Sequence, residues 1–250
     1  MHTQTTDDFV TTADGLDLVV HHRTTAAMPT AAIVVVHGFT ASGSCPEVGA
    51  LADALHGDDY DVVTYDARGH GGSPGASTLG DDEQYDVAAA VERARTRTDT
   101  VVVVGASMGA IATLRYAAGD ADLAGVVAVS CPAAWRLPRT ARAVAAAAMT
   151  RTVPGRMLTQ RLTGVRVASR WTDPSPPVDC AAALEVPVTY VHGTDDRFIP
   201  ARDAAELYDA TRDPRRLRIV RGMGHAFGDA AIDPIRDAVA WALSGAPLPR

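Results

Sequence analysis

The chain has 250 residues, of which 47% are hydrophobic, and this suits one α/β domain with a sizeable core. A formal net charge of −7 argues against a nucleic-acid-binding protein, and every basic side chain is arginine because lysine is absent. No apolar run is long enough to cross a bilayer, the N-terminus does not resemble a secretory signal, and the three cysteines follow no disulfide spacing. We therefore expect a cytoplasmic protein, a monomer or homodimer, that binds neither nucleic acid nor a membrane.

Short apolar runs alternate with amphipathic stretches along most of the chain. Residues 9–23 predict a hairpin with its turn at Asp14-Gly15. The pattern then predicts, in chain order, strand 32–36, helix 47–55, strand 62–65, helix 83–95, strand 101–104, a helix from 110, strand 125–129, strand 186–191, helix 201–210, strand 217–220 and a helix at 233–243. This alternation predicts a mostly parallel eight-stranded sheet flanked by helices, with an antiparallel start from the hairpin.

One segment departs from this alternation and lies between two predicted core strands. It contains an Ala-rich helical stretch at 139–151, a break at Pro154-Gly155, a second helix at 156–162 and a proline-rich exit. We predict that residues 1–130 and 185–250 form the core and that residues 131–184 form a small helical cap over the ends of the strands.

The stretch from Val101 to Gly109 carries most of the functional information. Four valines predict a buried parallel strand, which stops at Gly105, and Ser107 follows among small residues before the next helix. This is a Gly-x-Ser-x-Gly motif at a strand-to-helix turn, where the glycines permit a sharp turn that exposes the serine hydroxyl. We predict that Ser107 is a nucleophile.

A serine hydroxyl needs a base at neutral pH, commonly a histidine held by a carboxylate. After Ser107 the chain offers His192 and His225, and we favour His225 because it lies in a glycine-rich loop after the last strand. His192 lies directly at a strand end, which favours a structural role. Asp195 and Asp196 are both candidates for the carboxylate. We favour Asp196 because of the spacing of its loop, and the other aspartate could close a turn or cap the next helix.

The oxyanion that forms on acyl attack needs preorganised donors. We expect the backbone N–H groups of Phe39 and Met108 to supply them. The side chains of Phe39, Met108 and Trp135 are predicted to contact the substrate, the first two as walls of an apolar acyl pocket. We expect no cofactor and no metal, because the sequence has no His-Glu-x-x-His motif and its cysteines do not pair at ligand spacing.

With these motifs the chain resembles the serine hydrolases of the α/β-hydrolase superfamily, of the esterase, lipase or thioesterase kind with a short cap. The resemblance covers essentially the whole chain outside the cap, through His37-Gly38-Phe39, Tyr65 to Gly71, Gly105 to Gly109, His192 to Pro200 and Gly224-His225. The order Ser, Asp, His is the one that this fold requires. The resemblance implies that Asp66, Arg68 and His70 shape a turn near the oxyanion loop and are not catalytic. Because its nucleophile is a serine, the chain differs from the epoxide hydrolases and haloalkane dehalogenases of this fold, and it also lacks the His-Gly-Gly-Gly element of the hormone-sensitive-lipase type.

These observations predict an enzyme that cleaves a carboxylic ester or thioester of a small acyl substrate through an acyl-enzyme intermediate on Ser107. Other uses of the same triad stay open: acyl transfer, amide or C–C bond cleavage, and cofactor-free perhydrolysis. A non-catalytic ligand receptor is an alternative from another class.

The predicted cap reverses the charge of the chain. Between Asp122 and Asp173 there is no acidic residue, yet the segment carries arginines at 136, 139, 142, 151, 156, 161, 166 and 170. One interpretation is that the cap attracts an anionic substrate, such as a carboxylate or a phosphate. The other is a solvated face on Ala-rich helices, and the sequence slightly favours it.

Overall fold

Eight strands form a single sheet in the order β1-β2-β4-β3-β5-β6-β7-β8 in a computed structural model that describes residues 5–119, 122–135, 141–170, 172 and 174–245. The strands are β1 (Thr5–Thr11), β2 (Asp17–Arg23), β3 (Ala32–Val36), β4 (Asp61–Tyr65), β5 (Val101–Ala106), β6 (Gly125–Val129), β7 (Val188–Gly193) and β8 (Arg215–Val220). The strands from β3 to β8 are parallel, whereas β2 runs antiparallel to both β1 and β4. The predicted α/β-hydrolase fold class, with a mostly parallel eight-stranded sheet, is therefore confirmed.

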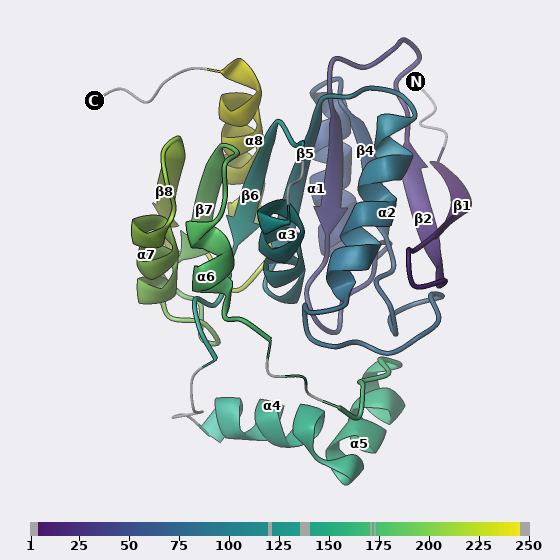
Figure 1. Cartoon of the computed structure of the whole chain (residues 1–250), viewed down its shortest axis with the longest axis vertical. Coiled ribbons are helices and arrows are strands. Elements are labelled where there is room, and N and C mark those ends of the chain that lie inside the picture. Colours follow the sequence, from purple (N-terminus) through teal and green to yellow (C-terminus); the bar gives the residue numbers. More distant parts are fainter. Residues whose placement is uncertain (1–4, 120–121, 136–140, 171, 173, 246–250) are drawn as a thin grey trace.

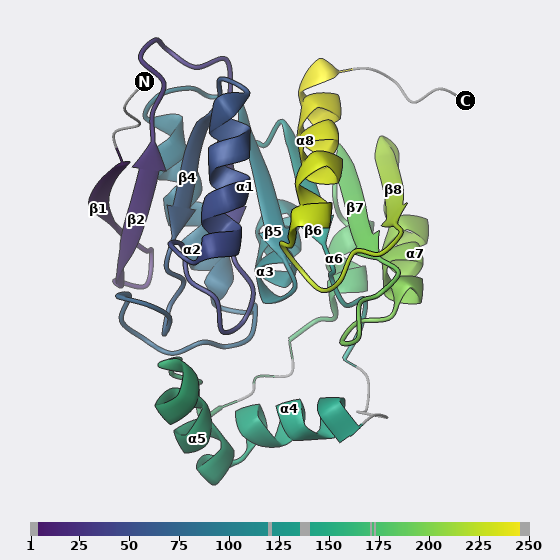
Figure 2. The same cartoon turned by 180° about the vertical axis from the view of Figure 1, so that it is seen from behind.

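Helices cover both faces of the sheet. They are α1 (Pro46–Gly57), α2 (Glu83–Arg95), α3 (Met108–Ala118), α4 (Ala141–Arg151), α5 (Val153–Thr163), α6 (Pro177–Ala182), α7 (Ala201–Ala210) and α8 (Asp229–Ser244). Figure 1 shows α2, α3, α6 and α7 in front of the sheet, and the opposite view in Figure 2 shows α1 and α8 on the other face. In this three-layer arrangement the helices cover the two faces of the sheet, and the loops that follow the parallel strands lie at the edge formed by their carboxyl ends.

Strand β5 packs into two hydrophobic clusters, one on each face of the sheet, through its run of four valines. Because side chains alternate along a strand, Val101 and Val103 pack into the cluster under α2, α3, α6 and α7, and Val102 and Val104 pack into the cluster under α1 and α8. All four are fully buried. A strand buried on both faces needs apolar residues at every position, so the run of valines reflects its central place in the sheet.

Helices α4 and α5 lie beyond the carboxyl ends of the strands, apart from the two helical layers (Figures 1 and 2). The chain that leaves α5 attaches to the core, where the backbone N–H of Arg166 donates to the carbonyl of Gly69 at 2.9 Å. The N–H of Ser77 donates to the carbonyl of Arg166 at 2.7 Å, and Ala168 donates to the carbonyl of Ser77 at 2.8 Å. The extent of the cap, residues 131–184, stays a prediction.

The sequence placed the second cap helix too late and missed α6. Helix α5 begins at Val153 because Pro154 is tolerated in a first turn, where the Thr152 hydroxyl also accepts from the N–H of Gly155 at 3.1 Å. Helix α6 begins at Pro177, the last residue of the predicted proline-rich exit, and its Ala181 is fully buried in the core that α3 and α7 share. The predicted start of the first cap helix, at residue 139, falls outside the described residues.

Two further expectations concern membrane-spanning helices and the cysteines. In the part of the chain that the structure describes, no helix has the length and apolar character needed to cross a membrane. Cys45, Cys131 and Cys180 are free thiols, and the last two are buried. The cytoplasmic location stays a prediction.

Candidate active site

The residues predicted to be catalytic all lie in loops that follow parallel strands. Ser107 directly follows β5, Asp196 lies in the loop after β7, and His225 lies between β8 and α8. Parallel strands bring their carboxyl ends to one edge of a sheet, which is where open α/β sheets collect functional groups. The three residues are therefore on the same edge of the molecule.

Ser107 adopts a backbone conformation that is rare for a residue with a side chain. Its φ of 53° and ψ of −114° lie on the left-handed side of conformational space, where strain costs about 1–3 kcal/mol. Hydrogen bonds fix the turn: the Ser107 N–H donates to the carbonyl of Val129 at 2.9 Å, and its carbonyl accepts from Ala110 and Ile111, both at 3.1 Å. Strain of this kind persists where the surrounding structure enforces it, as at a strand-to-helix turn that presents a nucleophile.

Two glycines of the motif make this sharp turn possible. A Cβ on Gly105 would lie 2.5 Å from the carbonyl oxygen of Gly109, and one on Gly109 would lie 2.4 Å from the carbonyl oxygen of Val36. Backbone atoms cannot move out of the way as a flexible side chain can. The glycines therefore allow α3 to start directly against β5 and β3.

Asp196 holds His225 in a defined orientation. The Nδ1 of His225 lies 2.7 Å from Oδ2 of Asp196, while Oδ1 accepts from the backbone N–H groups of Phe198 at 2.8 Å and Ile199 at 2.9 Å. Burial raises the pKa of Asp196, but the hydrogen bonds from His225, Ile199 and Phe198 outweigh it and hold the pKa at about 2. The carboxylate is thus ionised at neutral pH, so Nδ1 of His225 carries the proton that it donates. The side chain of Asp196 is 1% exposed and that of His225 is 23% exposed.

The alternative acid and base have other contacts. Asp195 accepts from the Thr194 hydroxyl at 2.8 Å, and its N–H donates to the carbonyl of Met223 at 3.0 Å. The ring of His192 is fully buried, with Nε2 3.0 Å from the carbonyl oxygen of Ile199 and 3.6 Å from Oδ2 of Asp196. His192 therefore supports the loop that carries Asp196.

The loop after β3 lies beside the serine. A Cβ on Gly38 would be 3.4 Å from the Cβ of Ser107, which brings the backbone of this loop next to the nucleophile. Burial lowers the pKa of His37 to about 4, and the neutral ring accepts from the N–H of Ala67 at 3.0 Å and lies 2.8 Å from the Gly38 carbonyl. Met108 occupies the first position of α3, where a backbone N–H has no partner within the helix.

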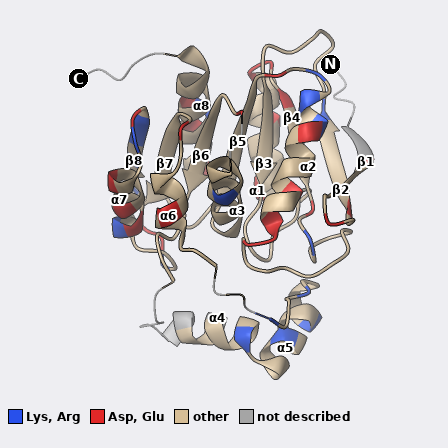
Figure 3. Cartoon of the chain, viewed as in Figure 1, with Lys and Arg blue, Asp and Glu red and all other residues tan. Residues whose placement is uncertain are grey.

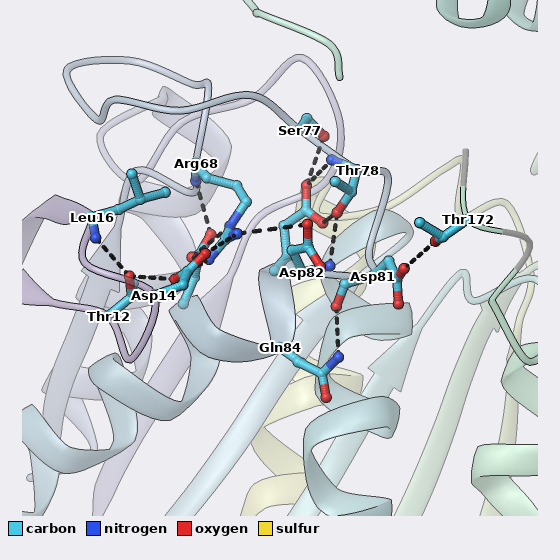
Figure 4. A network of polar contacts seen from close by, with 12 residues as sticks. Thr12, Asp14, Leu16, Arg68, Ser77, Thr78, Asp81, Asp82, Gln84 and Thr172 are labelled. Atoms are coloured by element: carbon cyan, nitrogen blue, oxygen red, sulfur yellow. Dashed lines mark hydrogen bonds and ion pairs between the residues drawn. The ribbon is translucent and has the colours of Figure 1, made fainter. Parts of the chain in front are cut away.

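Asp66, Arg68 and His70 stabilise the neighbouring loop. Asp66 accepts from the backbone N–H groups of Gly43 and Gly72, both at 2.8 Å. Figure 4 shows Arg68 turned toward Asp14, to which it donates two hydrogen bonds, at 2.8 and 3.0 Å. The ring of His70 meets the ring of Phe39 edge to face, with centroids 5.9 Å apart. Each of these side chains makes contacts that position the loops around the serine.

The sequence reasoning missed Glu83, a fully buried carboxylate at the start of α2. Its oxygens accept four hydrogen bonds, from the hydroxyl of Ser77 (2.7 Å), the N–H and hydroxyl of Thr78 (2.9 and 2.7 Å) and the N–H of Gly80 (2.8 Å). The Ser77 hydroxyl also lies 3.3 Å from the sulfur of Met108. Ser-Thr-x-Gly shortly before a helix that opens with Glu is the signal that could have indicated this cluster.

The three side chains predicted to contact the substrate have different surroundings. Met108 is 3% exposed and packs in the core, whereas Phe39 and Trp135 are half-buried against it. The indole N–H of Trp135 donates to the carbonyl of Pro174 at 2.6 Å. Contact with a substrate stays a prediction for all three. Among the described residues, no three His, Cys, Asp or Glu side chains group together as metal ligands.

The sheet, the strained serine turn and the paired His and Asp are those of an α/β hydrolase. The sequence profile of the serine aminopeptidase family S33 matches residues 27–174, more than half of the chain, and the protein belongs to this family. The matched region includes Ser107 and ends before Asp196.

The chain is also similar to two uncharacterized proteins, and it shares its fold with solved esterases. The chain is 27% identical over 225 residues to the uncharacterized protein YqkD of Bacillus subtilis, covering 87% of this chain and 72% of YqkD. It is 29% identical over 182 residues to the uncharacterized protein Rv2307c of Mycobacterium tuberculosis, covering 70% of this chain and 56% of that protein. The Pyrococcus furiosus esterase Pf2001 shares the fold with a TM-score of 0.75 at 19% identity, covering 97% of this chain and 92% of that one. The esterase RhEst1 from Rhodococcus sp. ECU1013 does so with a TM-score of 0.68 at 22% identity, covering 96% and 98%.

Proposed function

We propose that the protein is a serine hydrolase that cleaves carboxylic esters or thioesters through an acyl-enzyme intermediate on Ser107. The observation that carries this proposal is the 2.7 Å hydrogen bond between Nδ1 of His225 and Oδ2 of Asp196, at the sheet edge where the Ser107 turn lies. It leaves Nε2 of His225 available as a base. A histidine oriented by an ionised aspartate is the arrangement that activates a serine hydroxyl.

In the proposed reaction, the Oγ of Ser107 attacks the substrate carbonyl while Nε2 of His225 takes the hydroxyl proton. The negative charge of Asp196 stabilises the imidazolium that forms. Backbone N–H groups of Met108 and Phe39 stabilise the oxyanion of the tetrahedral intermediate. The bond to the leaving group then breaks, and His225 donates its proton to that alcohol or thiol. Water attacks the acyl-enzyme in the same way, which releases the acid and restores the serine.

Cleavage of a peptide amide is the second candidate, because the family takes its description from serine aminopeptidases. An aminopeptidase has to bind a free α-ammonium group, for which a carboxylate is the natural partner. Arg151, Arg156 and Arg170 contribute to the described lining of the cleft between α5 and the core, and no acidic side chain does so. This charge favours an ester or thioester over a peptide with a free N-terminus.

The test is a substrate panel that crosses acyl length with the leaving group: p-nitrophenyl esters, matched thioesters and aminoacyl p-nitroanilides. We expect turnover of short esters or thioesters by the wild type, and background rates for Ser107→Ala and His225→Ala. Preferred turnover of the anilides would favour the aminopeptidase. A wild type without turnover of any of these substrates, or a fully active Ser107→Ala variant, would contradict the proposed mechanism.

A further inference from the structure

A cleft separates the cap helices from the core loop that carries Ser77. It encloses about 530 Å³, including the part that is open to solvent. Its lining includes Ser77 and Thr78 from the core loop, Arg151 and Arg156 from the cap helices, and Arg170 from the returning chain. We propose that this cleft binds a carboxylate or phosphate group of the substrate. This inference rests on the proposed hydrolase function and names a class of substrate for it.

The first argument is charge. Of the described residues that line the cleft, three are arginines and none is acidic. Figure 3 shows blue segments on α4 and α5 with no red among them, whereas the helices of the core carry red as well as blue. In a chain with a net charge of −7, this cleft is a local positive site that attracts anions.

The second argument is that, within the described part of the chain, two of these arginines have no acidic partner. Arg68 and Arg115 of the core form ion pairs with aspartates. Among the described residues, Arg156 and Arg170 form no such pair, and Arg156 donates only to the backbone carbonyl of Arg151 at 3.1 Å. Arginine presents several donors in a planar fork that suits carboxylate and phosphate, so these two side chains can serve as ligands for an anion.

The third argument is the contact with the proposed catalytic turn. Ser77 lines the cleft, and its hydroxyl lies 3.3 Å from the sulfur of Met108, the residue directly after Ser107. Glu83 contacts Ser77 and Thr78 from the core side, but it is fully buried and its oxygens accept four hydrogen bonds from that loop. The cleft therefore borders the core loop that contacts the residue directly after Ser107.

Arg161 provides a matched control. Like Arg156 it is an arginine on α5, but it is exposed and does not line the cleft, whereas Arg156 is half-buried. If the arginines of the cap only form a solvated surface, substitution of Arg161 and of Arg156 will have equal effects on anion binding. If the cleft is a binding site, the effect will be confined to Arg156 and Arg170.

The first experiment measures binding apart from catalysis. Inorganic phosphate and glutarate are titrated calorimetrically into the full chain carrying Ser107→Ala, alone and combined with Arg156→Gln, Arg170→Gln or Arg161→Gln. We expect the dissociation constant of the anion to rise roughly tenfold or more with Arg156→Gln or Arg170→Gln, as for loss of a charge-assisted hydrogen bond. Arg161→Gln should leave it unchanged. Phosphate binding without glutarate binding would assign a phosphate group, and the reverse a carboxylate. No binding of either anion, or equal affinity in all variants, would overturn the proposal.

The second experiment compares two esters that differ in charge. The p-nitrophenyl half-ester of glutaric acid is compared with p-nitrophenyl 5-methylhexanoate, in which an isopropyl group replaces the carboxylate. We expect Arg156→Gln and added salt to lower kcat/KM for the half-ester roughly tenfold and to leave the neutral ester unchanged. An equal effect on both esters, or none on either, would overturn the anion site while the hydrolase function stands. If neither ester is cleaved, the proposed function fails and the calorimetry still decides on the anion site.

Discussion

His225 and Asp196 stand 29 residues apart in the chain, yet Nδ1 of one lies 2.7 Å from Oδ2 of the other. Replacing Asp196 with Asn removes the charge that stabilises a histidinium and disturbs the tautomer of the ring. We expect kcat for a p-nitrophenyl ester to fall by about 10⁴-fold. The control is Asp195→Asn, which removes the charge of the neighbouring aspartate and should leave kcat nearly unchanged. Comparable losses in both variants would show that the assignment of the acid is wrong.

The same carboxylate sets part of the acid sensitivity of the fold. The pKa of Asp196 is about 2 in the folded protein, below its ordinary value of 3.8, so its ionised form stabilises the fold. This contribution is complete above about pH 4, the ordinary range of an aspartate, and is lost as the pH falls toward 2. We expect the free energy of unfolding of the wild type, measured in urea, to fall over this range more steeply than that of Asp196→Asn. Parallel pH profiles would contradict the low pKa.

A methyl group on Gly109 should disrupt the serine turn. Its Cβ would lie 2.4 Å from the carbonyl oxygen of Val36 and 2.6 Å from that of His37, so the start of α3 has to shift. We expect Gly109→Ala to lower the free energy of unfolding by about 1–3 kcal/mol, as overpacking does, and to abolish ester hydrolysis. Gly57→Ala is the control, because a Cβ at Gly57 in α1 has no neighbour within 4 Å. A fully active and stable Gly109→Ala protein would refute this view of the turn.

Arg68 is expected to be important for stability and not for chemistry. Burial raises the pKa of Asp86 to about 6 in spite of the hydrogen bonds that it accepts from Arg68. Arg68→Met would leave that carboxyl buried without its partner, and the loss of a buried ion-pair partner costs about 3–5 kcal/mol. Thermal and urea unfolding measure the loss. Arg236→Met removes a partly exposed pair with Asp58 and should change stability much less. Equal effects of the two substitutions would contradict the structural role of Arg68.

The central strands and the serine turn could be predicted because their signals are local. The helix at 83–95 and the strand at 125–129 have the predicted bounds, and the run of valines marks a strand buried on both faces. The contact between Asp196 and His225 could be predicted because loops that follow parallel strands lie at one edge of the sheet. Neither prediction needed the side-chain packing.

Contacts between distant segments could not be predicted in this way. The sequence does not show that Arg68 reaches Asp14, 54 residues away, or that Ser77 joins Glu83 to the sulfur of Met108. It also cannot distinguish the cleft arginine Arg156 from the exposed Arg161, because only the placement of α5 across the cleft from the core decides which side of the helix faces the cleft. The sequence shows that the cap segment is positively charged, but it does not show that some of these arginines line a cleft.

The most direct test of the account is covalent labelling of the wild type with a fluorophosphonate probe, followed by mass spectrometry of the intact protein and of its peptides. We predict one adduct per chain, on Ser107, and none in Ser107→Ala. His225→Ala should react far more slowly, because its serine has lost the base. A wild type that is not labelled, or that carries the adduct on another residue, would contradict the acyl-enzyme mechanism.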